Sequence, residues 1–144
     1  MNAPFHQTIA NDFADLSRLM EGATTFLESQ GVDAQAVYRI NLALEEMVTN
    51  IIKYGYDEPG RHQIEVTLEV GANEVAAVII DDGHDFNPVL QERKPPADKL
   101  EDREIGGLGI HLMKKLLDHL EHRREGGRNI LEIKARRKPV PPPA

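Results

Sequence analysis

The amino-acid sequence predicts an α+β protein, a two-layer α/β sandwich with helices on one face of a mixed, mostly antiparallel sheet. Two long stretches in the first half carry apolar residues at helical spacing, and later stretches alternate apolar and polar residues as strands do. Short turns join the predicted strands in pairs. Hairpin-linked strands with helices segregated to one face argue against a doubly wound parallel sheet.

Length and composition predict one compact domain. The 144 residues are enough to bury a core, and we expect this domain over residues 1–138, with a disordered proline-rich tail at 139–144. The chain has no cysteine, which excludes disulfides and thiolate zinc sites.

Charge and hydropathy bear on whether the protein binds nucleic acids or membranes. The net charge of -7 argues against general nucleic-acid binding, although the last part of the chain is basic. A basic edge could meet an acidic partner, but such runs are more often solvated faces. There is no basic and apolar leader and no stretch of membrane-spanning length, so we expect a cytoplasmic protein without a membrane partner.

The first two elements are a short edge strand over residues 5–9 and a helix from about Asp12 to Ser29. The inward side of this helix is predicted to carry Phe13, Leu16, Leu19, Met20, Ala23 and Phe26.

A second helix is predicted after Asp33, a suitable N-cap, and Gly55 is typical of a helix end. Its apolar stripe consists of Val37, Ile40, Leu44, Met47, Val48 and Ile51. At roughly 100° per residue, Glu46 and Asn50 fall together on the opposite side, with Lys53 beside them. They could act on one ligand, or they could be the wet face of a surface helix.

Alternation predicts a half-buried strand over residues 62–70 and a turn at 71–73. The apolar run at 75–80 predicts a central strand buried on both faces, which ends in Asp81-Asp82-Gly83. Residues 84–104 contain three prolines and no sustained period, which indicates a long loop that is functional or disordered.

The glycine-rich segment 105–109 leads into a predicted helix that ends near His119. Its inner side is predicted to carry Ile110, Met113, Leu116, Leu117 and Leu120. A closing hairpin follows, with strands at 120–124 and 129–136 around Gly126-Gly127.

Two segments suit a nucleotide. Asp82, beside Gly83 at the mouth of the sheet, could accept a hydrogen bond from an exocyclic amine, whereas the alternative is an Asp-Gly hairpin turn. The residues that follow do not form a second strand, which argues against the hairpin. The glycines at 106–109 open a helix, where free N–H groups attract phosphate; the alternative is a hinge or close packing. Neither a Rossmann nor a P-loop motif is present.

Together, in this order, the three segments resemble the Bergerat ATP site of the GHKL ATPase superfamily, and in particular its anti-sigma factor serine/threonine-protein kinases. LALEEMVTNIIKYGY is similar to the N box of this family. The resemblance implies that Glu46 is the general base, that Asn50 binds Mg²⁺, and that Lys53 and Tyr54 line the nucleotide site.

DDGHDFNP resembles the first glycine box, which implies that Asp82 accepts from adenine, with Gly83 and Phe86 beside it. IGGLGIHLMKK resembles the second, and implies nucleotide contacts from Ile105, Gly106, Gly107, Leu108, Gly109 and Ile110 after an ATP lid at 87–105. The chain departs from the family twice: Ile105 replaces a glycine, and the late-strand threonine near adenine has no obvious match in GGRNILEIK.

The resemblance implies a Mg²⁺- and ATP-dependent kinase that phosphorylates a STAS-domain anti-anti-sigma protein and, as a homodimer, sequesters a sigma factor. One alternative is an ATP-binding interaction module with little or no kinase activity. Another is the catalytic domain of a histidine kinase, although the chain has no dimerisation hairpin with a phosphorylatable histidine. We expect all six histidines to be structural or on the surface, with His119 and His122 too isolated to bind metal.

Overall fold

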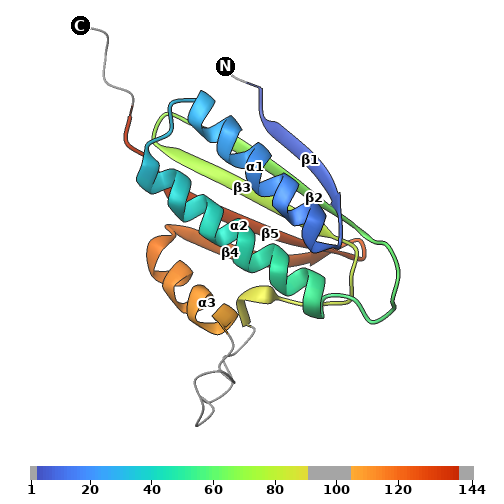
Figure 1. The fold of residues 1–144 in the computed structure, drawn as a ribbon. Coiled ribbons are helices and arrows are strands. Elements are labelled where there is room, and N and C mark those ends of the chain that lie inside the picture. Colours follow the sequence, from blue (N-terminus) through green and yellow to red (C-terminus); the bar gives the residue numbers. More distant parts are fainter. Residues whose placement is uncertain (1–2, 91–104, 140–144) are drawn as a thin grey trace, which may run out of the picture.

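The computed structural model describes residues 3–90 and 105–139, and it confirms the α+β class (Figure 1). The elements in chain order are β1 (Phe5–Ala10), α1 (Phe13–Ser29), α2 (Ala34–Tyr54), β2 (Gln63–Val70), β3 (Glu74–Asp81), the 3₁₀ helix η1 (Pro88–Leu90), α3 (Ile105–Leu116), β4 (His119–Glu125) and β5 (Arg128–Arg136). Most of the predicted tail and most of the predicted lid lie outside the described residues.

The described sheet has five strands in the order β1-β2-β3-β5-β4. Every pairing within it is antiparallel, so the predicted mixed sheet is corrected to an antiparallel one. The closing hairpin inserts its second strand, β5, beside β3 and leaves β4 at the edge. This arrangement sets Asp81, at the end of β3, opposite Asn129, at the start of β5.

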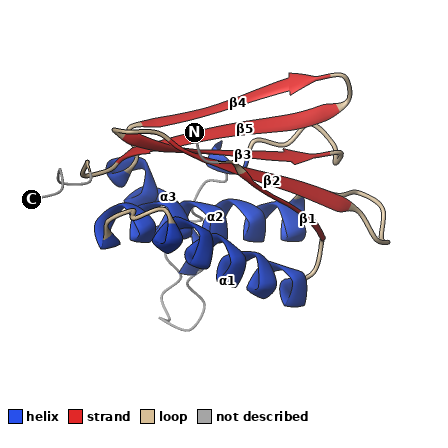
Figure 2. Ribbon diagram, turned by 90° about the horizontal axis from the view of Figure 1, so that it is seen from above, coloured by secondary structure: helices blue, strands red, loops and turns tan. Residues whose placement is uncertain are grey.

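The described α-helices, α1, α2 and α3, cover one face of the sheet, and we call the other face the open face (Figure 2). The core lies between the layers, where Leu44, Met47, Ile79 and Ile133 are fully buried. The prediction that residues 75–80 are buried on both faces is wrong. Burial alternates along β3, and the residues directed to the open face are only half-buried because no helix covers them.

The helices begin and end near their predicted positions, with two corrections to their inner faces. Phe13, predicted to face inward, is 50% exposed, whereas Leu27 is fully buried. α3 ends at Leu116, and Leu120 belongs to β4. Among the helices that the structure describes, none combines the length and the apolar composition that a membrane crossing requires.

The predicted caps of α2 are confirmed. The Asp33 carboxylate accepts a hydrogen bond from the Ala36 N–H at 3.2 Å, and Gly55 N–H donates to Ile51 O at 2.8 Å. α2 also packs against the sheet and lies beside η1 and α3 (Figure 1). α2 is therefore the helix that brings polar side chains to the end of β3 and the start of β5.

Candidate functional site

Glu46 lies on α2, half-buried, with Glu45 and Lys53 close enough to affect its charge. Burial raises the pKa of the Glu46 carboxyl above its ordinary value, the charge of Glu45 adds to this effect, and Lys53 opposes it. A carboxylate with a raised pKa is a better proton acceptor than an ordinary one. Lys53 itself is exposed, at the end of the same helix.

The sequence predicts Asn50 on the side of the helix away from the apolar stripe, where the alternative is a solvated surface, but the residue is buried. Asn50 is only 4% exposed, on a helix that packs against η1 and α3 as well as against the sheet. Its Nδ2 has no hydrogen-bond partner among the described residues. A buried N–H donor without a partner is costly, and an oxygen of a bound ligand could accept from it; the amide oxygen of the same side chain is a ligand type that Mg²⁺ accepts. The buried side chain therefore fits a role with a bound ligand.

The end of α2 is joined to the loop after β3 by backbone contacts. His84 N–H donates to Gly55 O at 3.0 Å, and the His84 Nε2 lies 2.7 Å from Tyr54 O. A Cβ atom on Gly83 would lie 2.2 Å from Gly55 O, so no other residue fits there without movement. The first two predicted site segments therefore form one unit.

Three rings gather at this junction. The Phe86 ring centroid lies 5.8 Å from that of His84 and 6.5 Å from that of Tyr54. Phe86 and Tyr54 are half-buried, so they offer apolar surface beside the polar groups of α2. The predicted nucleotide contacts of these two residues stay predictions.

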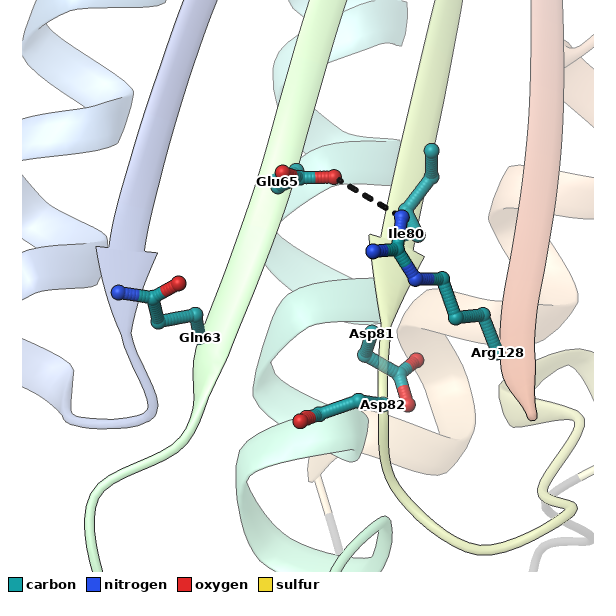
Figure 3. Close-up of a pocket in the computed structure, with 6 residues that line it drawn as sticks. All are labelled: Gln63, Glu65, Ile80, Asp81, Asp82 and Arg128. Atoms are coloured by element: carbon teal, nitrogen blue, oxygen red, sulfur yellow. Dashed lines mark ion pairs between the residues drawn. The ribbon is translucent and has the colours of Figure 1, made fainter. Parts of the chain in front are cut away.

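Asp82 is exposed and lies at the open face of the sheet (Figure 3). It lines a small cavity of about 70 Å³ there (Figure 3). The other lining residues are Gln63, Glu65, Ile80, Asp81 and Arg128, with Arg128 and Glu65 3.9 Å apart as an ion pair. The side chain that the sequence led us to expect at adenine is thus on the opposite face from Glu46 and Asn50.

Asp81, one residue earlier, belongs to the buried face of β3 and is 3% exposed. Its Oδ1 accepts hydrogen bonds from Gly83 N–H at 2.9 Å and from Asn129 Nδ2 at 3.0 Å. Burial raises the pKa of the Asp81 carboxyl, and the two hydrogen bonds only partly oppose that increase. A buried acidic group with a raised pKa is a marker of functional sites.

Sequence reasoning missed Asn129, which contacts both Asp81 and the loop that follows it. The residue gives no local signal, because it only follows a glycine turn in GGRNILEIK. Its position depends on the register between β3 and β5, two strands that are far apart in the sequence. His122 is also part of this site, with Nε2 3.0 Å from Asn129 Oδ1.

The third predicted segment starts α3, which lies alongside α2 (Figure 1). The predicted nucleotide contacts of residues 105–110 fall outside the described side chains. The structure therefore brings the first two segments together and leaves the contacts of the third as predictions.

The expectation that His119 stands alone is wrong. Its Nε2 lies 3.4 Å from Glu121 and 3.1 Å from Glu132, because β4 and β5 pair in a register that sequence reading did not supply. The three ligand atoms lie within 4.8 Å of one another. Lys134 Nζ lies 3.8 Å from the Glu132 carboxylate and already balances part of its charge, so we assign no metal to this cluster.

Comparison with known families matches residues 9–135 to the model of the histidine kinase-like ATPase domain. A solved structure of the RsbU and RsbW domains of Rv1364c from Mycobacterium tuberculosis has a TM-score of 0.67 to this chain. It covers 96% of this chain and 34% of that one, at 17% sequence identity. That likeness shows a shared fold.

Three curated relatives carry related names. Serine/threonine-protein kinase BtrW of Bordetella bronchiseptica is 28% identical over 100 residues, 69% of this chain and 70% of that protein. Anti-sigma F factor of Clostridium beijerinckii is 30% identical over 61% of this chain and 62% of its own length. Serine-protein kinase RsbW of Bacillus subtilis is 25% identical over 61% and 58%. The chain thus spans less than two thirds of the length of the latter two.

Proposed function

Because the chain belongs to the histidine kinase-like ATPase family, we propose that it is a Mg²⁺- and ATP-dependent serine/threonine-protein kinase and an anti-sigma factor. The observation that carries the proposal is the pair on α2: a half-buried Glu46 with a raised pKa, and a buried Asn50 amide one turn later. The names of the relatives, which include serine-protein kinases and an anti-sigma F factor, support the same activity.

In this proposal adenine binds beside Asp81, and not beside Asp82 as the sequence suggested. Both hydrogen bonds to Asp81 reach Oδ1, and within the described part of the chain no donor pairs with Oδ2. A carboxylate oxygen in this position accepts a hydrogen bond from an exocyclic amino group. Asp82 faces the open side of the sheet, where neither Glu46 nor Asn50 can reach the same ligand.

Asn50 and Glu46 have different roles near the phosphates of the bound ATP. Asn50 would hold Mg²⁺ through its side-chain oxygen, and the bound ion supplies positive charge that offsets the charge developing in phosphoryl transfer. Glu46 accepts the proton of the attacking serine or threonine hydroxyl, a role for which its half-buried position and raised pKa suit it. The glycines at 106–109 would receive the phosphates at the start of α3.

The acceptor in this proposal is a STAS-domain anti-anti-sigma protein, and the unmodified kinase, as a cytoplasmic homodimer, sequesters a sigma factor. Phosphorylation adds close to two negative charges to the acceptor, which is enough to disrupt a fitted interface. The released kinase then captures the sigma factor. No direct contact with nucleic acid is required.

Phosphoryl transfer tests the proposal. Incubation with radiolabelled ATP, Mg²⁺ and a STAS-domain protein from the same genome should label a serine or threonine of the STAS protein. Glu46→Gln should reduce the rate at least about 100-fold and leave ATP affinity unchanged, because it removes the proton acceptor and keeps the shape. The matched control, Glu45→Gln on the exposed side of the same helix, should retain transfer.

Two outcomes would change the account. Transfer that survives Glu46→Gln at the normal rate would remove Glu46 from the role of base. ATP binding without transfer by the unaltered protein to any STAS protein of that genome would favour the second candidate, an interaction module that binds ATP without kinase activity.

A further inference from the structure

We propose that Asn129 is a positioning residue that orients the Asp81 carboxylate, and so sets the preference of the site for a base with an exocyclic amino group. The inference rests on the proposed function, because it deepens the role given there to Asp81. Asn129 lies at the start of β5 and is 2% exposed, so its side chain makes its contacts inside the protein.

The side-chain amide of Asn129 uses its whole hydrogen-bonding capacity. Nδ2 donates to Asp81 Oδ1 at 3.0 Å and to His84 O at 2.7 Å. Oδ1 accepts from Phe86 N–H at 3.3 Å and lies 3.0 Å from His122 Nε2. An asparagine amide has two donor hydrogens and two acceptor lone pairs, so none is left for a ligand. Asn129 therefore acts on a nucleotide through Asp81.

The geometry fixes which Asp81 oxygen meets the ligand. Asn129 Nδ2 and Gly83 N–H both donate hydrogen bonds to Asp81 Oδ1. These two bonds leave Asp81 Oδ2 directed away from the protein donors. Without Asn129, one of the two donors that distinguish the oxygens would be lost, and the carboxylate could rotate. A rotated carboxylate offers a poorer acceptor to an amino group, because hydrogen bonds weaken steeply with misalignment.

The same amide also anchors the loop after β3. It bonds residues 84 and 86, while Arg124 Nη1 donates to Gly83 O at 2.9 Å. Hydrogen bonds from the start of β5 and from β4 thus hold both the loop after β3 and the Asp81 carboxylate. Both strands begin more than 30 residues after Asp81 in the sequence. A hydroxyl has one donor hydrogen, so a serine or threonine at 129 could bond Asp81 or His84 O, but not both.

Nucleotide discrimination tests this role. Calorimetry should measure the Kd values of ATP and of ITP, which carries a carbonyl oxygen where ATP has the amino group. The unaltered protein should prefer ATP by about tenfold or more, the size expected for a hydrogen bond to a charged acceptor. Asn129→Ser should weaken ATP about tenfold and ITP much less, so that the ratio of the two Kd values falls toward one.

Asn73→Ser is the matched control, because it makes the same change in the turn before the other end of β3. It should leave the ratio unchanged. Thermal unfolding would show whether Asn129→Ser folds; if it does not, Asn129→Thr, which also has a single donor hydrogen and keeps more of the side-chain volume, should lower the ratio too.

The outcomes separate this inference from the proposed function. Equal losses for ATP and ITP in a folded Asn129 variant, with the ratio preserved, would overturn the positioning role and leave only a structural one. No preference for ATP in the unaltered protein would instead overturn the assignment of Asp81 to adenine, and with it the premise of this inference.

Discussion

At the scale of single residues, Asp81 is a carboxyl group that the fold buries at a cost. Its pKa in the folded protein is raised, chiefly by burial, so the folded state favours the neutral form. The stability that the raised pKa of Asp81 contributes is therefore fully present at pH values below the unfolded-state pKa near 3.8. It is lost as the pH rises through the higher pKa of the folded state. The fold keeps a carboxyl group at this position despite this loss, which is expected where function requires it.

Asp81→Asn should separate stability from binding. An asparagine Oδ1 can still accept from Gly83 and Asn129, and the amide carries no charge to desolvate, so urea denaturation at pH 7 should give a free energy of unfolding equal to or above that of the unaltered protein. ATP affinity should fall about 10- to 100-fold, because the acceptor for the amino group is gone. Asp82→Asn, the exposed control, should change neither quantity; loss of ATP binding in that variant alone would return adenine to Asp82.

Glu46 should report its surroundings through the pH dependence of kcat. Transfer requires the ionised base, so kcat should fall as the pH decreases through the raised pKa of Glu46. Glu45→Gln removes a negative charge that repels the Glu46 carboxylate, so the fall of kcat should occur at lower pH. Lys53→Met removes a positive charge that attracts it, so the fall should occur at higher pH. If neither substitution moves the fall of kcat, another group titrates there.

At the scale of elements, α2 depends on the residues that follow β5. The Asp33 carboxylate that caps α2 also accepts from Lys138 N–H at 2.8 Å. The buried guanidinium of Arg137 donates to Gly31 O at 3.1 Å and to Gly71 O at 3.4 Å, so it ties the start of α2 to the turn between β2 and β3. The helix that carries Glu46 and Asn50 is thus fixed at the end far from the site.

Arg137→Ala should lower the free energy of unfolding by about 2 kcal/mol, because a charged donor to two carbonyl groups is lost from a buried position. Its neighbour Arg136 has an 83% exposed side chain, and Arg136→Ala should change stability by no more than about 0.5 kcal/mol. Urea denaturation measures both. Equal effects of the two substitutions would mean that the buried contacts of Arg137 do not stabilise the start of α2.

The same scale shows what the sequence could predict. The caps of α2 and the hairpin around Gly126 were readable because they depend on neighbours along the chain. The face of a side chain at the end of a strand was not, since a change of one position exchanges Asp81 for Asp82 and one face for the other. The burial of Asn50 and the contacts of Asn129 depend on packing and register between distant segments, for which a single sequence gives no local signal.

At the scale of the whole molecule, the sheet has one face for the core and the candidate site and one open face (Figure 2). The candidate site lies where the end of α2, the end of β3 and the start of β5 meet, joined by hydrogen bonds through Gly55, His84 and Asn129. The cavity beside Asp82 lies on the open face, and neither Glu46 nor Asn50 is among its lining residues. The central claim is that ATP binds on the helix side.

A crystal structure of the chain with Mg²⁺ and a non-hydrolysable ATP analogue tests that claim most directly. The account predicts the adenine amino group within hydrogen-bond distance of Asp81 Oδ2, the phosphates near the start of α3, and Mg²⁺ at the side-chain oxygen of Asn50. A nucleotide bound on the open face beside Asp82 and Arg128, or crystals that take up none at millimolar concentration, would contradict it.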